Sequence, residues 1–347
     1  MDFGLHPLLK DPDAVLVYHE PVPERPCPED FERIARRTLE AMQVSLSGQK
    51  VAIKPNLTSG EHFADPDTGI TTHPAFVGGL VQYLYQHGAK PGGIYIVEDP
   101  RDSDDHNPRH WRGTGYLEIA RATGAQIRCP STFYCVKKVV PRPFVHPVRK
   151  VTRYAVDSDT VLIDVPKMKS HNLGMTLLCM KNLMGLDDVY ERHFCGQAWQ
   201  ELPADRRFDD RPKNEWKDRQ LHETWQTGLA RRLADLAQVV RPALNIVEGV
   251  IARDGTGFNR GTNFPLGLAV AGTNLVAVDS VTSYIMGFDP LELIYLKVAH
   301  EAGLGNNNLS KLHIYIEENG KIVPCEDART IRTPEPFRVI RDIIGDA

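Results

Sequence analysis

The chain has 347 residues, of which 41% are hydrophobic and 25% are charged, and this is the composition of an ordinary globular protein. Its formal net charge of −4 at pH 7 argues against a general nucleic-acid binder, although it allows a local basic pocket. No window approaches about 18 uncharged apolar residues, and the first residues lack the basic flank of a leader peptide. We therefore expect a cytoplasmic protein with no nucleic-acid or membrane partner, and the oligomeric state stays open.

The cysteines and histidines do not form a recognisable metal or cluster motif. The six cysteines are scattered and include no C-x-x-C pair, which iron–sulfur clusters and zinc ribbons usually require. The thirteen histidines include no H-E-x-x-H pattern. The thiols are expected to be reduced, and the sequence assigns neither a metal nor a cofactor.

Helical and strand-like segments alternate along the first half of the chain. Apolar residues at helical spacing predict helices over 31–43, 74–88, 116–124 and 176–185. Short apolar runs predict strands over 50–54, 93–99, 125–129 and 160–165. Helices that separate short strands imply crossover connections and a mainly parallel sheet.

The same alternation resumes in the second half. A helix is predicted over 229–240, strands over 243–250 and 265–272, and helices over 274–287 and 291–303. The sequence thus predicts an α/β fold, with mainly parallel or mixed sheets and flanking helices, built as two intimately associated α/β units.

The two predicted units are 1–189, which carries a lysine-rich motif, and 226–325. Between them, residues 190–225 are polar and lack a clear period, which fits a lid over a pocket or a plain surface insertion. Residues 326–347 form a C-terminal tail that is expected to end in a short docked helix.

The lysine-rich motif is VPKMKSHNLGMTLLCMKNLMG, in which Lys167, Lys169 and His171 directly follow the buried strand TVLIDV. The carboxyl ends of parallel strands are where open α/β sheets bind ligands. Other polar residues follow predicted strands in the same way, namely Lys54, Asn56, Glu98 and Glu248. We expect all of these side chains to converge on one edge of one sheet.

Clustered ammonium groups need a negative partner, because burying an unpaired charge costs several kcal/mol. A small phosphate- or carboxylate-bearing ligand would provide that partner. Alternatively, Glu98 or Glu248 neutralises the lysines internally, and the sequence leaves both possibilities open.

Several further side chains each have two possible roles. Thr72 and His73 either cap the helix that follows them or help to bind an anion at its start. Lys181, next to Asn182 in an apolar helix, either faces a ligand or extends to solvent. Asp279 is either a partner for the lysines or a cap for a backbone turn. The glycines of GTGFNRG, at 255–261, are a weak signal for close backbone approach to an anion.

The segments VAIKPNL, TTHPAFVGGLVQYLYQHGA, IYIVED, DTVLIDVPKMKSHNLGMTLLCMKNLMG, PALNIVEGV and LVAVDSVTSYIMGFDP together resemble the domain of unknown function 362 family. The resemblance covers residues 51–305, and the lysine-rich motif is its most specific part. It implies site residues at Lys54, Asn56, Thr72, Glu98, Lys167, Lys169, His171, Lys181, Asn182 and Asp279. Many relatives carry a ferredoxin-like cluster segment or an export signal, and this chain resembles a member without a cluster.

The first unit is also similar, at the level of the fold, to the N-terminal domain of lactate racemase. In that domain a Thr-then-Pro loop and a helix start hold a phosphorylated nickel-pincer nucleotide.

The leading hypothesis is an enzyme that acts on a small anionic substrate through a lysine-rich pocket, in a specialised biosynthetic pathway. The catalytic candidates are His171, Lys169 and Glu98. Substrate binding would use Lys54, Asn56, Thr72, His73, Lys167, Lys181, Asn182, Glu248 and Asp279. Transferase, isomerase and oxidoreductase chemistry all fit. The alternative is a non-catalytic binder or carrier of a phosphorylated or metal-bearing cofactor, which needs the positive charge but no acid–base group.

Overall fold

The computed structural model describes residues 3–57, 66–98, 111–130, 134–188, 190–202, 219–258 and 260–339. Its strands are β1 Ala14–His19, β2 Lys50–Pro55, β3 Ile94–Val97, β4 Gln126–Arg128, β5 Cys135–Val139, β6 Val148–Thr152, β7 Thr160–Val165, β8 Lys167–Lys169, β9 Leu244–Arg253, β10 Asn263–Gly272, β11 His313–Glu318 and β12 Lys321–Pro324. Its helices are α1 Pro28–Ala41, α2 Pro74–Gln86, α3 Tyr116–Thr123, α4 Arg153–Val156, α5 Cys179–Asn182, α6 Phe194–Gln200, α7 Arg219–Val239, α8 Leu275–Ile285 and α9 Ile294–Glu301.

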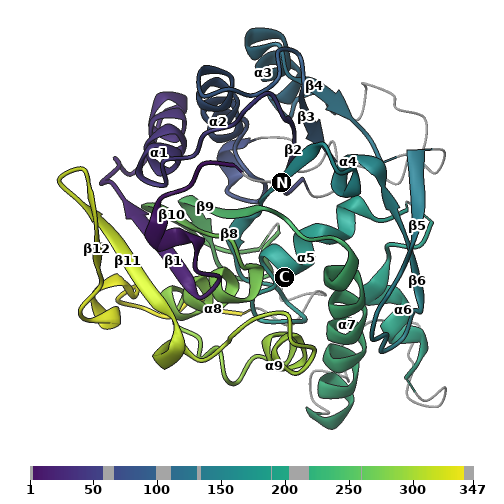
Figure 1. The fold of residues 1–347 in the computed structure, drawn as a ribbon. Helices are drawn as coiled ribbons and strands as arrows, with labels where there is room; N and C mark the ends of the chain where they lie inside the picture. Colours follow the sequence, from purple (N-terminus) through teal and green to yellow (C-terminus); the bar gives the residue numbers. More distant parts are fainter. Residues whose placement is uncertain are drawn as a thin grey trace.

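One mixed sheet forms the centre of the molecule. Among the described residues it has ten strands in the order β12-β11-β1-β10-β9-β7-β2-β3-β4, with β8 beside β9 (Figure 1). The run from β9 to β4 is parallel, while β10 is antiparallel to β9. This arrangement confirms the predicted α/β fold. Because β9 of the second predicted unit pairs directly with β7 of the first, a single sheet crosses the border between them.

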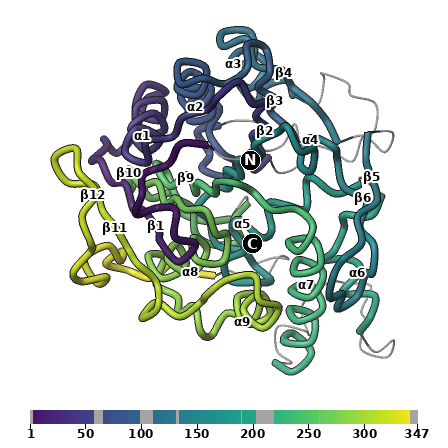
Figure 2. The backbone as a smooth tube through the Cα atoms, viewed as in Figure 1, coloured from purple at the N-terminus to yellow at the C-terminus, as the bar shows by residue number. Residues whose placement is uncertain are grey.

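The edge of the sheet formed by β12, β11 and β1 joins segments from both ends of the chain. Strand β1 lies between β10, to which it is antiparallel, and β11, to which it is parallel. Figure 2 shows this as a purple segment held between green and yellow ones. The first strand thus ties the C-terminal part of the described chain into the sheet.

Strand alternation places an apolar layer on each face of the sheet. In β2, Val51 and Ile53 belong to one core cluster and Ala52 to the other. Helices α1, α2 and α3 cover the first face, and α5, α7, α8 and α9 gather on the second (Figure 1). Lys54 follows Ile53 in the alternation, so it shares the second face with Ala52.

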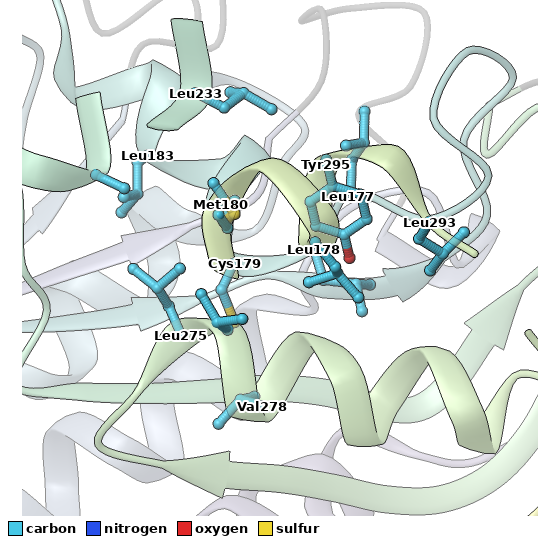
Figure 3. Packing of buried hydrophobic residues seen from close by; sticks show 14 of the residues in the cluster. Leu177, Leu178, Cys179, Met180, Leu183, Leu233, Leu275, Val278, Leu293 and Tyr295 are labelled. Atoms are coloured by element: carbon cyan, nitrogen blue, oxygen red, sulfur yellow. The ribbon is translucent and has the colours of Figure 1, made fainter. Parts of the chain in front are cut away.

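The helix expected over 176–185 is shorter than predicted. Met175 has a positive φ of 65° and Leu178 has a ψ of −99°, so helix α5 begins only at Cys179. A 3₁₀ turn over Leu183–Leu186 continues it. Figure 3 shows the surrounding packing, in which Leu177, Leu178, Cys179, Met180 and Leu183 lie among Leu233, Leu275, Val278, Leu293 and Tyr295.

The predicted insertion and tail are only partly described. In the insertion, α6 is followed by 203–218, which lie outside the described residues, so a lid there stays a prediction. Helix α7 begins at Arg219, and the expected border at 225 therefore falls inside a helix. In the tail, Phe337 stacks on Phe264 with 4.8 Å between ring centroids, and Arg338 pairs with Asp254 at 2.8 Å. The expected terminal helix falls partly on 340–347, outside the described residues.

Candidate functional site

The carboxyl ends of three neighbouring parallel strands meet at one edge of the sheet. Strands β2, β3 and β7 end there, which brings Lys54, Glu98 and Lys167 to the same edge. Glu248 was expected at the end of its strand, but β9 continues beyond it to Arg253. It still lies level with this edge, because it pairs in register with Lys167 of β8.

The first of two buried ion pairs joins Lys54 to Glu98. Lys54 Nζ lies 2.5 Å from Glu98 Oε2, and the two side chains are 1% and 5% exposed. Lys54 Nζ also donates to the Pro55 carbonyl at 2.7 Å and to Asn182 Oδ1 at 3.2 Å. Asn182 in turn donates through Nδ2 to the Lys54 carbonyl at 2.9 Å and to Asp164 Oδ1 at 2.8 Å. These side chains therefore hold one another.

The second buried ion pair joins Lys167 to Glu248. The charged atoms are 2.6 Å apart and both side chains are fully buried. Burial lowers the pKa of Lys167, and the carboxylate of Glu248 opposes that shift. Glu248 also accepts hydrogen bonds from the backbone N–H groups of His73, Val250 and Ile251 at 3.2, 3.0 and 3.4 Å. Both of its oxygens are thus occupied by the protein.

The strand-end lysines are therefore paired as the internal alternative predicted. The contacts that the structure gives to Lys54, Glu98, Lys167, Asn182 and Glu248 are contacts within the protein. The roles expected for them in catalysis or substrate binding stay predictions.

Thr72 and His73 are also fixed by local contacts. Thr72 Oγ1 donates to the Val165 carbonyl at 2.7 Å and accepts from the Asn56 N–H at 2.9 Å. His73 Nδ1 accepts from the Ala75 N–H at 3.2 Å and so caps helix α2. Burial, and secondarily the charge of Lys167, lowers the pKa of His73 to about 3, so the capping imidazole is neutral.

Asp279 has the contacts of a backbone cap rather than those of a lysine partner. Its carboxylate accepts from the N–H groups of Cys179 and Met180 at 2.7 and 3.2 Å, at the start of α5. Burial raises its pKa to about 6. Of the two roles considered for Asp279, the structure supports the cap.

A second group of side chains lies next to the two ion pairs; we call Lys169, His171, Lys181, Arg253 and Phe258 the outer cluster. Lys169 Nζ lies 4.9 Å from the centroid of the Phe258 ring, and the His171 ring lies 6.4 Å from it. Lys169 also donates to the Ile70 carbonyl at 2.9 Å. Burial lowers the pKa of Lys169 to about 7, with further lowering by the charges of Lys181, Lys167 and Arg253.

His171 is held as a neutral hydrogen-bond donor. Its Nδ1 accepts from the backbone N–H groups of Leu173 and Gly174 at 3.1 and 3.3 Å, so its proton is on Nε2. Burial lowers its pKa well below the usual value, and Lys181 and Lys169 add to that shift. A neutral imidazole whose acceptor nitrogen is already used can donate from Nε2 but is a poor general base.

Two cations of the outer cluster, Lys181 and Arg253, form no ion pair with the residues that the structure describes. Lys181 is half-buried, and the described part of the chain gives it no hydrogen bond or ion pair. The guanidinium of Arg253 binds neutral oxygens, namely the Phe258 and Thr68 carbonyls at 2.7 and 3.2 Å and Asn263 Oδ1 at 2.6 Å. Directly after β2, the side-chain oxygen of Asn56 is buried and has no hydrogen-bond partner among the described residues.

Two members of the outer cluster were not predicted. Phe258 belongs to the glycine loop at 255–261, whose glycines indicated close approach to an anion. The approach is instead to the protein: a Cβ on Gly257 would lie 2.1 Å from the Ser170 carbonyl oxygen. Arg253 has no signal in the sequence, because its position depends on the unexpected length of β9.

A cavity of about 490 Å³ lies between α7 and α9, beside the loop that follows His171. Its charged lining is mixed, with Arg219 and Lys297 facing the same space as Glu223 and Glu292. Acidic and basic side chains thus line this cavity together.

Asp164 and Asn245 present two buried oxygens without donors. The two residues are register partners on β7 and β9, and neither Asp164 Oδ2 nor Asn245 Oδ1 has a hydrogen-bond partner among the described residues. Burial raises the pKa of Asp164 well above its usual value. A protonated Asp164 would donate to Asn245 and satisfy both oxygens.

Replacing Asp164 by Asn is therefore expected to keep the fold and flatten its pH dependence. Because its pKa is raised on folding, the stability that Asp164 contributes is fully present below its unfolded pKa of about 4 and is lost as the pH rises through its folded pKa. Urea unfolding of Asp164→Asn should thus lose less stability than the wild type from about pH 4 to 7. Asp159→Asn is the control, because the pKa of this exposed carboxyl is lowered, chiefly by Lys50. An unchanged slope in Asp164→Asn contradicts a protonated Asp164.

The described residues contain no group of three or more His, Cys, Asp or Glu side chains placed to hold a metal ion. Nor does any helix among them have the length and apolar character needed to cross a membrane.

Comparison with protein-family models shows which family the chain belongs to. The model of the family described as domain of unknown function (DUF362) matches residues 51–284. The chain belongs to this family. The match includes both ion pairs and the whole outer cluster, so these features lie within the DUF362 domain. The fold-level resemblance to lactate racemase stays a prediction.

Two similar proteins add context. A thylakoid-associated protein, sll1697, of Synechocystis sp. is 25% identical over 259 residues, which cover 74% of this chain and 69% of that protein. A crystal structure of a Thermotoga maritima protein aligns with a TM-score of 0.38 and 12% identity, over 85% of this chain. This chain spans 61% of that structure's chain.

Proposed function

We propose that this DUF362 protein is an enzyme that binds a small carboxylate- or phosphate-bearing substrate at the outer cluster. The observation that carries the proposal is the uneven distribution of charge. Glu98 and Glu248 balance Lys54 and Lys167, whereas Lys181 has no ion pair in the described structure and Arg253 binds neutral oxygens. An anion at the outer cluster would balance the excess charge.

Two groups in the outer cluster favour an enzyme over a carrier. A carrier needs only fixed positive charge, and such charge is provided by Lys181 and Arg253. Lys169, with a pKa of about 7, can exchange a proton near neutral pH. His171 offers an Nε2–H donor beside it, suited to hydrogen-bond a substrate oxygen.

Anion titration of Lys181→Met tests the proposal. Methionine keeps most of the side-chain volume and removes the charge, and charge-assisted hydrogen bonds contribute roughly 1.5–3 kcal/mol each. We expect the affinity for oxalate or inorganic phosphate, measured by calorimetry, to fall about tenfold or more.

Lys311→Met is the matched control, because Lys311 is exposed on a turn before β11 and should not affect the affinity. Equal affinities in the wild type and Lys181→Met, or no binding of either anion, contradict an anion site at the outer cluster.

We also infer a cytoplasmic location and no nucleic-acid partner, and the net charge of −4 supports the second of these inferences. The printed name of the Synechocystis relative associates that protein with the thylakoid, and a membrane association of this chain is the alternative. Recovery of the chain in the membrane fraction after cell fractionation would favour that alternative.

A further inference from the structure

Lysines that form imines share three requirements. The amine must be partly unprotonated near neutral pH, and proteins achieve this by burying the lysine or placing another cation beside it. The amine must be shielded so that the product is not hydrolysed at once. A hydrogen-bond donor must also be near the oxygen that leaves as water. The outer cluster meets each of these requirements.

The position of Lys169 meets the first two. It is partly buried, and its electrostatic neighbours Lys181, Lys167 and Arg253 are cations that lower its pKa. The Phe258 ring lies 4.9 Å from Nζ and covers one side of the amine. The Phe258 loop is held against this segment, because Ser170 Oγ donates to the Gly255 carbonyl at 2.9 Å.

His171 provides the donor and Lys181 a binding group. The His171 ring lies in an edge arrangement with the same Phe258 ring, with 6.4 Å between the ring centroids and 67° between the ring planes. Backbone hydrogen bonds to Nδ1 fix the proton on Nε2. Lys181 acts on both Lys169 and His171 electrostatically, and its ammonium group is available for a carboxylate.

We propose that Lys169 is a nucleophile that condenses with the carbonyl group of a small carbonyl-bearing carboxylate, such as a 2-oxo acid, to form an imine. The proposal rests on the proposed function, because it uses Lys181 to hold the carboxylate. It adds a covalent step and a substrate class.

The step is balanced without an oxidant or reductant. The neutral Nζ adds to the carbonyl carbon, the carbonyl oxygen receives a proton, and the nitrogen loses one, which gives a carbinolamine. The hydroxyl then takes up a proton from solvent and leaves as water while the nitrogen lone pair forms the C=N bond, and His171 Nε2–H donates a hydrogen bond to the departing oxygen. The protonated imine that results returns its N–H proton to solvent. One amine and one carbonyl compound give one imine and one water.

Reductive trapping tests the step. The full chain is incubated with glyoxylate and sodium cyanoborohydride, which reduces an imine to a stable secondary amine, and the modified lysines are mapped by mass spectrometry. An ordinary lysine with a pKa of about 10.4 is unprotonated to less than about 0.1% at pH 7, whereas a lysine whose pKa is lowered to about 7 would be unprotonated to about half. Lys169 should be modified at least about tenfold faster than exposed Lys311, with a pH midpoint near 7.

Two variants and a second probe separate the contribution of the Lys169 amine from that of the Lys181 charge. Lys169→Met should remove the fast modification and leave that of Lys311 unchanged. Lys181→Met should slow the modification of Lys169 by glyoxylate and move its midpoint to higher pH, because a cationic neighbour is lost. Propanal, which has no carboxylate, should react with Lys169 equally well in the wild type and Lys181→Met at high pH.

The labelling and binding measurements distinguish a wrong imine proposal from a wrong anion site. If Lys169 reacts no faster than Lys311 while oxalate still binds through Lys181, the imine proposal is wrong and the anion site stands. If Lys169 is slow and oxalate does not bind, both are wrong. A fast reaction at Lys169 with a midpoint near 7 supports the imine.

Discussion

Replacing Lys167 by Met is expected to lower the free energy of unfolding by about 3–5 kcal/mol, which is the usual cost of removing one partner from a buried ion pair. Lys167 and Glu248 are both fully buried, so the substitution leaves the Glu248 carboxylate without its cation. The measurement is denaturant unfolding monitored by circular dichroism. The double variant Lys167→Met/Glu248→Gln should recover part of the loss, since no charge then remains.

Lys169→Met is the matched control two residues along the same segment. Burial and neighbouring cations disfavour a charge on Lys169, so removing it should leave the stability equal or raise it. Its effect should appear in ligand affinity instead. If Lys169→Met unfolds easily and Lys167→Met does not, the division between the buried ion pairs and the outer cluster is wrong.

The central strands and most helices could be predicted because they are long and strongly periodic. Strand β7, for example, has the bounds expected from the run TVLIDV. Strands β1, β5, β6, β8, β11 and β12 were not predicted. Strands β5, β11 and β12 are mostly half-exposed and have no continuous apolar run, whereas the buried apolar run of β1 was missed. Helix α5 was predicted too long, because its start depends on Asp279, about 100 residues away in the sequence.

The sequence predicted where Lys54, Glu98 and Lys167 lie and left their pairing open. Parallel strands meet at one edge, so the position of Lys54, Glu98 and Lys167 followed from the order of elements. Which lysine meets which carboxylate depends on register: Lys167 faces Glu248 only because β8 runs beside β9. The pattern therefore indicated a cluster of cations, and only the structure shows that Lys167 pairs with Glu248.

The second large effect on stability is expected from a substitution at Gly185. Because glycine has no side chain, the turn after α5 can lie directly against the ion pair of Lys54 and Glu98. A Cβ at this position would lie 2.5 Å from both Glu98 Oε1 and Lys54 Cε, and 2.7 Å from Lys54 Nζ. The pair is buried and also bonded to Asn182, so it has little room to move. We expect Gly185→Ala to lower the free energy of unfolding by roughly 2–4 kcal/mol, through overpacking and a weakened ion pair.

Gly196→Ala is the control, because a Cβ at that position in α6 would meet nothing within 4 Å. There the substitution should be neutral or stabilise by up to about 1 kcal/mol, since alanine favours the helix. The cause at Gly185 is tested by repeating Gly185→Ala in a Glu98→Gln background. If the methyl group acts by separating Lys54 from Glu98, its added cost must be smaller there, because contacting residues couple energetically. An equal cost in both backgrounds means that the methyl group clashes without disturbing the pair, and Gly185 is then a packing residue only.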